Sequence, residues 1–265
     1  AGGTVENCTT EGGKTIALKV TAAYNSYTGG IVGCADGAVT GCTNKQPLSI
    51  MANRYNSDGE ACRYAYIGGV AGKTAGALSD SKNRGAISAA AICKFVIMGG
   101  IVGSADGAVS NVVNVAQVSA PGNPGGKEGI LKEKYIGPRY AYVGGIVGQL
   151  TAEGSVTGNG DTTNSGSVKI EQMEHTADAL VYVGGIVGQH LGKISNTVNA
   201  GEVSVTGAPD SGTANWNVRC LGGIAGIIGG ADVAGAGATI SDSKNLALVS
   251  HSTLAKSNAK PIYVG

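Results

Sequence analysis

Short runs in which aliphatic and polar residues alternate recur along the whole chain. In one unit, Tyr142-Val143 leads to Ile146-Val147, and Val156, Val168 and Ile170 follow. Such strand-length segments, rich in β-branched residues and punctuated by Gly or Asn, are typical of β-strands. No unit carries ten or more residues with the period of an amphipathic helix. The pattern therefore predicts an all-β chain.

A glycine-pair box followed by the same downstream order of residues recurs six times, at intervals of 31 to 45 residues. The boxes begin at Gly29, Gly68, Gly99, Gly144, Gly184 and Gly222. A period of this size indicates stacked supersecondary units. We therefore expect a parallel β-solenoid, or β-helix, of about six to seven coils with roughly three short strands in each.

The two ends of the chain match the interior of the repeat. Val5-Glu6-Asn7-Cys8 aligns with Val39-Thr40-Gly41-Cys42, and Tyr263-Val264-Gly265 aligns with Tyr182-Val183-Gly184. Each unit of such an array contacts mainly its neighbours, so the array has no fixed length. We expect residues 1–265 to be a single array and a segment of a longer one, with flanking repeats or domains of the same polypeptide as its nearest partners.

One asparagine recurs in every unit ahead of the last aliphatic-Ser step, with one short insertion before the fourth. These residues are Asn44, Asn83, Asn114, Asn164, Asn199 and Asn245. Asparagine tolerates the left-handed backbone conformation and can bond to its own backbone, so it suits a tight corner. We expect a ladder of stacked amides. An active-site role is the less favoured alternative, because every unit carries the residue.

Four cysteines fall into matching repeat positions, Cys8 with Cys42 and Cys62 with Cys93. Neighbouring strands lie about 4.8 Å apart, which is within the Cα separation that a disulfide accepts. We expect each pair to lie in adjacent coils, where it is either cross-linked or a stack of free thiols. The chain has no Cys-x-x-Cys or paired-His motif, so we expect no metal site.

The composition excludes several classes of partner. Glycine contributes 46 residues, Phe and Trp one each, and the net charge is only +1. The Lys and Arg residues are scattered, so there is no electrostatic footprint for nucleic acid. The most apolar stretch, residues 220–240, is largely Gly and Ala and contains Asp232, so we expect no membrane insertion.

Motifs that resemble catalytic or nucleotide sites have simpler explanations. The segment Gly68 to Thr74 resembles a phosphate-binding loop, but Ile67 stands where the first glycine is required. The histidines His175, His190 and His251 occupy unrelated repeat positions, and we expect them to be solvated surface residues. We predict no catalytic residue and no cofactor.

Two acidic residues are a further candidate for chemistry. Asp36 and Asp106 share a repeat position, and β-helices do assemble carboxylate pairs for glycan chemistry from adjacent coils. Ala75 stands in the coil between them, so a turn role is favoured. The segment from Asn56 to Glu60 lacks the length and ligand number of a calcium loop.

Three long insertions lie between the last aliphatic-Ser step of a unit and the next box. They are Met51 to Arg63, Pro121 to Arg139 and Gly207 to Arg219. Insertions at equivalent places map to one face of a solenoid, which is often its binding face. The candidate binding residues are Arg54, Tyr55, Tyr135, Arg139, Trp216 and Arg219, side-chain types that are enriched at energetic contacts. A host protein or glycan is the expected partner.

A tyrosine stands two residues before most boxes, at Tyr27, Tyr66, Tyr142, Tyr182 and Tyr263. In the other units Ile or Cys takes this place. Aromatic stacking contributes about 0.5–1.5 kcal/mol per pair beyond burial. A structural ladder is favoured over a sugar-binding platform.

The repeat also resembles a known motif. The Gly-Gly-Ile-Val-Gly box followed by Gly-x-Ile/Val-Ser-Asn, a further Asn and Gly-x-Val-Ser is similar to the GLUG motif of bacterial surface proteins, best at residues 184–204 and well at 99–119. The resemblance implies a β-helical repeat fold in a secreted or cell-surface bacterial protein. Members include large exported adhesins and the non-catalytic repeat regions of some immunoglobulin-cleaving metalloproteases. The Asn-Cys step survives only at Asn7-Cys8, and Pro47 replaces the usual Gly.

Three functions follow from these observations. The first is a non-catalytic structural or adhesive repeat module of an exported bacterial surface protein. The second is an accessory, substrate-positioning region of a secreted protease or glycan-active enzyme. The third is a β-helix enzyme that acts on polysaccharide. The first is favoured, because nothing in the repeat brings a nucleophile and a base together.

Overall fold

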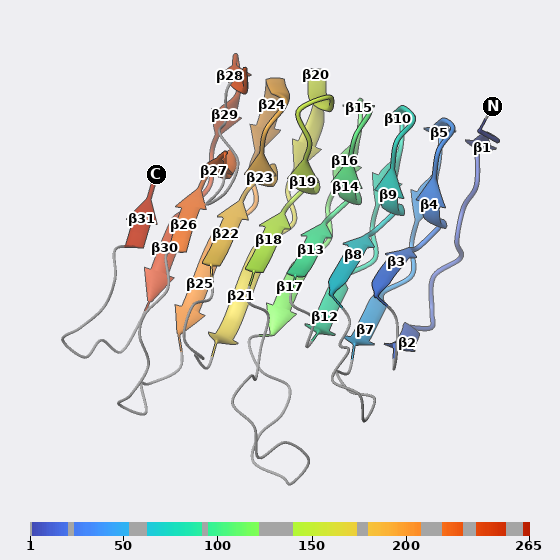
Figure 1. The fold of residues 1–265 in the computed structure, drawn as a ribbon, viewed down its shortest axis with the longest axis horizontal. Helices are drawn as coiled ribbons and strands as arrows, with labels where there is room; N and C mark the ends of the chain where they lie inside the picture. Colours follow the sequence, from blue (N-terminus) through green and yellow to red (C-terminus); the bar gives the residue numbers. More distant parts are fainter. Residues whose placement is uncertain are drawn as a thin grey trace, which may run out of the picture.

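A computed structural model describes residues 2–20, 24–52, 63–91, 95–121, 140–173, 180–207, 219–229, 237–252 and 262–265. Within these ranges every regular element is a β-strand, and the strands pair in parallel in four sheets, here called A to D (Figure 1). The N- and C-termini lie at opposite ends of the stack (Figure 1). The predicted all-β, parallel solenoid is confirmed.

Sheets B and C each contain seven strands. Sheet B comprises β2 (Ile16–Val20), β7 (Leu48–Ala52), β12 (Ile87–Ala91), β17 (Val118–Pro121), β21 (Val168–Met173), β25 (Val203–Gly207) and β30 (Val249–Ser252). Sheet C comprises β3 (Asn25–Gly29), β8 (Tyr64–Gly68), β13 (Phe95–Gly99), β18 (Tyr140–Gly144), β22 (Leu180–Gly184), β26 (Arg219–Gly222) and β31 (Ile262–Val264).

Sheet D has six strands and sheet A eleven shorter or bent ones. Sheet D comprises β4 (Val32–Ala35), β9 (Ala71–Thr74), β14 (Val102–Ala105), β19 (Val147–Leu150), β23 (Val187–His190) and β27 (Ala225–Ile228). Sheet A comprises β1 (Val5–Glu6), β5 (Val39–Thr40), β6 (Thr43–Asn44), β10 (Leu78–Ser79), β11 (Lys82–Asn83), β15 (Ala108–Ser110), β16 (Val113–Asn114), β20 (Ser155–Asn164), β24 (Lys193–Asn199), β28 (Thr239–Ser241) and β29 (Lys244–Asn245).

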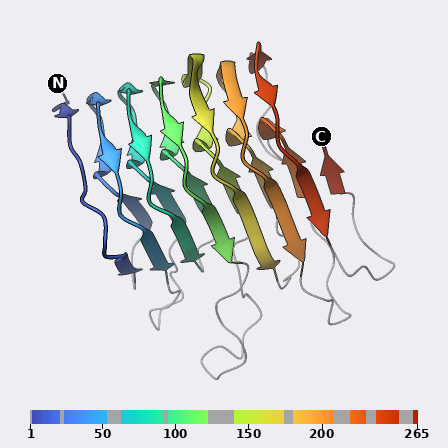
Figure 2. The ribbon, with the colours of Figure 1, turned by 180° about the vertical axis from the view of Figure 1, so that it is seen from behind.

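One coil of the solenoid passes through sheets C, D, A and B in that order. The strands β8, β9, β10 with β11, and β12 make up such a coil, after which β13 begins the next. Each coil therefore has four sides, one more than the three strands expected. The added side arises because the chain turns within each box, whose first glycine ends a sheet C strand and whose third glycine lies in the sheet D strand that follows. Figure 2 shows the stacked coils from behind.

The coils keep one register through sheet C. The first glycines of the boxes, from Gly29 to Gly222, all pair with one another in neighbouring strands. A Cβ built on the third glycine of a box, such as Gly148, would lie 2.6 Å from the Met98 backbone nitrogen. The glycine therefore lets sheet D lie against the backbone of sheet C, where no side chain fits.

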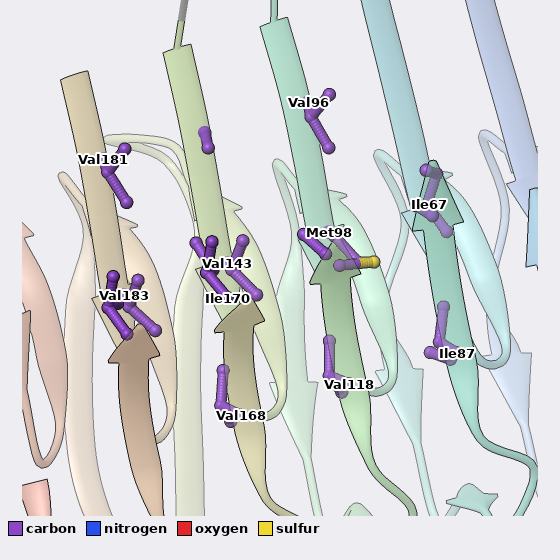
Figure 3. Close-up of a cluster of buried hydrophobic side chains, with 14 of the residues drawn as sticks. Ile67, Ile87, Val96, Met98, Val118, Val143, Val168, Ile170, Val181 and Val183 are labelled. Carbon is purple, nitrogen blue, oxygen red and sulfur yellow. The ribbon is translucent and has the colours of Figure 1, made fainter. Parts of the chain in front are cut away.

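Two separate hydrophobic cores fill the coil. The first core lies between sheets B and C, where Ile67 and Met98 of sheet C meet Ile87 and Val118 of sheet B (Figure 3). The second core lies between sheets D and A and includes the aliphatic residue that follows each glycine pair. Aliphatic residues dominate both cores, and their burial supplies the main favourable free energy of folding.

Candidate functional site

The six repeated asparagines form a continuous amide ladder through the stack. In each step the Nδ2 atom of one asparagine donates to the Oδ1 atom of the asparagine in the next coil. The N···O distances are 2.8 Å for Asn44–Asn83, 2.9 Å for Asn83–Asn114, 2.8 Å for Asn114–Asn164, 2.8 Å for Asn164–Asn199 and 2.8 Å for Asn199–Asn245. Thr10 closes the first end of the ladder, because its hydroxyl donates to Asn44 Oδ1.

Each ladder amide also bonds to its own backbone two residues on. Asn114 Nδ2 donates to the Ala116 carbonyl at 2.9 Å, and Asn114 Oδ1 accepts from the Ala116 N–H at 3.3 Å. Asn83, Asn114 and Asn199 thus use both hydrogens of the amide nitrogen and make two hydrogen bonds to the amide oxygen, and all three are fully buried. These contacts give the asparagines a structural role, and an interior amide has no donor left for a substrate.

The ladder asparagines are not the left-handed corner residues that the sequence led us to expect. That conformation lies three residues before five of them, at Gly41, Asp80, Asn111, Asn196 and Asp242, and four residues before Asn164, at Gly160. Asn7 has the same conformation three residues before Thr10. The ladder asparagines instead end a strand of sheet A, with the side chain turned inward. The reason is that Asp, Asn and Gly adopt positive φ at little cost, so the corner accepts any of them, whereas the ladder needs both an amide donor and an amide acceptor.

The amide ladder explains the second glycine of each box. A Cβ built on Gly100 would lie 2.5 Å from Asn114 Cγ, and the equivalent clash occurs between Gly69 and Asn83 and in every other coil that has a box. Gly100 lies at the corner between sheets C and D, and Asn114 lies near the corner between sheets A and B. This contact draws the two corners together and divides the first core from the second.

Cys8 and Cys42 lie in adjacent coils, joined by a hydrogen bond from the Thr43 N–H to the Cys8 carbonyl at 2.8 Å. Both are free thiols. Cys42 Sγ donates to the Thr40 carbonyl at 3.3 Å, just as the Ser81 hydroxyl in the next coil donates to the Ser79 carbonyl at 2.7 Å. The thiol therefore takes the place of a hydroxyl, and burial raises the pKa of Cys42. Cys62 and Cys93 lie outside the described residues.

The expectation that the histidines are solvated is wrong for His190, which is fully buried at the end of β23. Its Nε2 atom lies 3.0 Å from the Thr239 carbonyl oxygen, and its Nδ1 atom has no hydrogen-bond partner. Burial lowers the pKa of His190. A histidine is accommodated there because the same register position holds large side chains in the neighbouring coils, the fully buried Leu150 and the partly exposed Ile228. His251 lies half-buried in β30, and His175 falls outside the described residues.

The segment that resembles a phosphate loop uses its amides for pairing between coils. The N–H groups of Val70 and Ala71 both donate to the Ile101 carbonyl, at 2.9 and 3.1 Å. Lys73 forms an ion pair of 3.1 Å with Asp106, and Thr74 is fully buried. Neither those two amides nor the lysine is free for a phosphate.

The two aspartates of the shared repeat position do not form a carboxylate pair. Hydrogen bonds from Ala75 N to the Ala35 carbonyl and from Asp106 N to the Thr74 carbonyl place the coil of Ala75 between Asp36 and Asp106. The calcium-like segment from Asn56 to Glu60 lies outside the described residues. No group of three or more metal-ligating side chains occurs in the described part of the chain.

Five of the candidate binding residues, Arg54, Tyr55, Tyr135, Arg139 and Trp216, lie outside the described residues. The sixth, Arg219, begins β26, where its backbone pairs with Val181 and Ile262. All three insertions join the end of a sheet B strand to the start of a sheet C strand. Because the strands of each sheet lie in register, these bracketing ends share one edge of the solenoid, here called the B–C edge.

An exposed cluster that our sequence reasoning missed lies at the B–C edge. The Arg63 guanidinium carbon lies 5.4 Å from the centre of the Tyr24 ring and 5.6 Å from that of Tyr64, and Arg63 Nη1 also contacts the Tyr24 hydroxyl. Tyr24 is 56 % exposed. The available signal was the position of Arg63 as the last residue of the first insertion, directly before a strand.

The tyrosines before the boxes form an aromatic column on the outer face of sheet C. The ring centres are 5.1 Å apart for Tyr27 and Tyr66 and 5.5 Å apart for Tyr142 and Tyr182, with nearly parallel planes. The remaining members of the column are Ile97, Cys220 and Tyr263. Burial is the main cause that raises the pKa of Tyr66 to about 12.

A second aromatic row, which the sequence reasoning missed, lies two residues earlier in the same strands. Phe95 stacks on Tyr64 at 4.5 Å and on Tyr140 at 4.3 Å. Within each row, the ring of one coil stacks on the ring of a neighbouring coil, so other aromatic rings cover much of the ring faces. A sugar platform needs an open ring face, and this geometry supports the structural interpretation.

The apolar stretch from Cys220 to Ile240 supplies β26, β27 and part of β28 where it is described. Over the described ranges, no helix has the length and apolar character of a membrane span. No family model, curated protein or solved structure matches the chain. The resemblance to the GLUG motif therefore rests on the repeat residues alone.

Proposed function

We propose that the chain is a non-catalytic structural and adhesive module of an exported bacterial surface protein, with the B–C edge as its binding surface. The observation that carries the proposal is the in-register pairing of the seven-stranded sheets B and C, which shifts only at the end of β21 and brings the strand ends that bracket their connections to one edge. The resemblance to the GLUG motif supports the proposed location, at the cell surface or secreted.

The stack has the physical properties of a spacer. Parallel strands hydrogen-bond each coil to the next, and the amide ladder adds one buried side-chain bond at each step. Bending the stack would require several of these bonds to stretch together. Each coil also adds one strand spacing of about 4.8 Å, so length scales with the number of repeats.

The B–C edge offers the chemistry of an adhesive contact. Arg63 and Tyr24 expose a guanidinium and an aromatic ring side by side, and both types are enriched among the residues that dominate binding energies. Such a pair fits a protein surface or a glycan that presents a carboxylate or a hydroxyl-rich face. A host protein or glycan remains the proposed partner.

The experiment is a binding screen of the immobilised chain against extracellular proteins and glycans. Any partner found is then tested with Arg63→Ala, Tyr24→Ala and the control Lys193→Ala, which removes an exposed positive charge on sheet A. Loss of binding in the first two variants but not in the control supports the proposal. Equal binding by all three variants excludes the described B–C edge, and turnover of a glycan without stable binding favours the enzyme alternative.

A further inference from the structure

His190 stands out because a titratable side chain is buried inside the second core. Its side chain is fully buried, and the residues in register with it are Leu150 in the preceding coil and Ile228 in the following one. Leu150 belongs to the second core, as does Ile194 of sheet A. An apolar residue would fill this position, so the imidazole needs another explanation.

The ring makes one hydrogen bond, and that bond fixes its protonation state. Because the Thr239 carbonyl only accepts, Nε2 must carry the hydrogen and donate it over 3.0 Å. Nδ1 then holds a buried lone pair with no partner. A neutral ring tolerates this arrangement, whereas a proton on Nδ1 would place an unpaired donor and a positive charge in an apolar core.

His190 and Gln189 bond the following coil at two places, the residue after β27 and the first residue of β28. The His190 carbonyl accepts from the Gly229 N–H at 2.9 Å, and Gln189 Nε2 donates to the Gly229 carbonyl at 3.1 Å, just after β27. The His190 ring holds Thr239, the first residue of β28. One turn of chain thus anchors the end of β27 and the start of β28.

We propose that His190 is an acid-sensitive latch that holds β28 and β29 onto the stack. When the solution is acidified, Nδ1 takes a proton from solvent, the charged ring leaves the core for water, and the bond to the Thr239 carbonyl is lost. The sheet A strands of this coil then separate from β24, while the coils before it stay paired.

The described surroundings contain no group that would compensate the charge. The strands in contact with β23 are β13, β18, β19, β22 and β27, and Thr239 belongs to β28; none of these strands carries a charged side chain. On sheet A, across the second core, Lys193 lies on β24, Asp161 on β20 and Glu153 in the turn before β20, and all three are exposed. Burial is accordingly the first cause of the lowered pKa of His190.

The sign of the pH effect follows from this lowered pKa. The unfolded ring binds a proton near its ordinary pKa of 6.5, but the folded ring does so only at lower pH. The stability that the neutral ring supports is therefore present above the ordinary pKa and is lost as pH falls below it. Between the pKa of the unfolded ring and that of the folded ring, the ratio of latched to open protein falls about tenfold for each unit by which the pH is lowered.

Hydrogen exchange followed by mass spectrometry tests the latch at about pH 7.5 and about pH 5, with intrinsic rates corrected for pH. In the wild-type protein, peptides covering 237–252 should lose protection at the lower pH by about tenfold per pH unit, while peptides covering 64–91 should not. His190→Leu, which copies Leu150 of the preceding coil, should remove this pH dependence. His251→Gln is the control and should keep it.

The proposal is overturned if His190→Leu keeps the local pH dependence, or if protection falls equally in all coils. Should His190→Leu fail to fold, nitrogen-detected NMR of the wild-type imidazole gives the answer. The latch requires the Nε2–H tautomer and a titration midpoint below the ordinary value that coincides with loss of the β28 amide signals. A ring that titrates while those signals stay unchanged excludes it.

Discussion

The amide ladder inside the coil and the aromatic column on its outer face both repeat one residue type along the stack, yet they tolerate change differently. Asparagine occupies the ladder position in all six coils that have a box. The aromatic column is interrupted by Ile97 and Cys220. The two arrays share the same spacing and the same number of neighbours, so repetition alone does not explain the difference.

The kind of interaction explains it. Asn114 makes four hydrogen bonds away from water, and its removal takes one bond from a partner in the coil on either side and two from its own backbone. A ring in the aromatic column contributes contact area, which another apolar side chain supplies in part. A directional buried network restricts a position to one residue type, and a packing contact restricts it only to a size and polarity.

The largest loss of stability should come from substituting the second glycine of a box, which contacts a ladder asparagine. In Gly100→Ala the new Cβ would overlap the Gly145 carbonyl oxygen and lie 2.5 Å from Asn114 Cγ. Because the backbone on both sides is paired, little can shift, and we expect a loss of at least about 4 kcal/mol in the free energy of unfolding. Urea denaturation measures it. Gly3→Ala, where a Cβ meets nothing within 4 Å, is the control and should be close to neutral.

The amide itself should come next. Asn114→Ala removes the partner of Asn164 Oδ1, of one hydrogen on Asn83 Nδ2 and of the Ala116 N–H and carbonyl, and we expect a loss of about 3 kcal/mol. The matched control is Asn245→Ala, because Asn245 is the exposed last member and water replaces its bonds. The same urea titration compares the two variants. Equal losses at both sites would show that burial does not set the strength of the ladder.

The aromatic column should tolerate a similar test. Tyr142→Ile copies the residue that already stands at Ile97 in the adjacent coil and removes the stack on Tyr182. We expect a loss of about 1.5 kcal/mol, the value of one aromatic pair with some burial. A thermal unfolding midpoint records it. A loss as large as that of Asn114→Ala would remove the distinction between the inner and outer arrays.

The smallest change in stability should come at Cys42, a buried position where the side chain makes simpler hydrogen bonds than a ladder amide. Cys42→Ser places a hydroxyl at the position that Ser81 holds in the next coil, where it bonds the Ser79 carbonyl, so we expect the free energy of unfolding to change by less than about 0.5 kcal/mol. Urea denaturation measures it.

Thiol labelling tests the position of Cys42 in a second way. Cys8 and Cys34, which are exposed, should react in the native protein, whereas buried Cys42 with its raised pKa should react only after unfolding. Fast native labelling of Cys42 would contradict the assigned position.

The repeat itself was readable from the sequence, because a box such as Gly99-Gly100 imposes the same backbone corner wherever it occurs. It led to the parallel stack, the register of the boxes, the ladder of asparagines and the column of tyrosines. The same logic placed the insertions between sheets B and C. Each of these features depends on residues that recur in sequence, and recurrence is visible without a structure.

Features that occur once, or that depend on contacts across the coil, were not readable. His190 stands at a register position that the other coils fill with small or apolar residues, and its burial depends on strands of the coils on either side. The left-handed corner was assigned to the wrong asparagine, because Asn111 and Asn114 offer the same residue type three positions apart. Arg63 and Tyr24 meet only because they directly precede the neighbouring strands β8 and β3 of sheet C.

The sequence by itself determined that the chain is a stack of like units and which residues recur in each, since a period is a property of the order of residues. Only the tertiary structure decided what those residues do. It showed that the second glycine of each box leaves room for the amide of a ladder asparagine, and that two cores rather than one fill the coil. It also showed that the Cys42 thiol takes the place that the Ser81 hydroxyl has in the next coil. The reason is physical: side-chain roles here are set by contacts between coils, roughly forty residues apart in sequence and one strand spacing of about 4.8 Å apart in space.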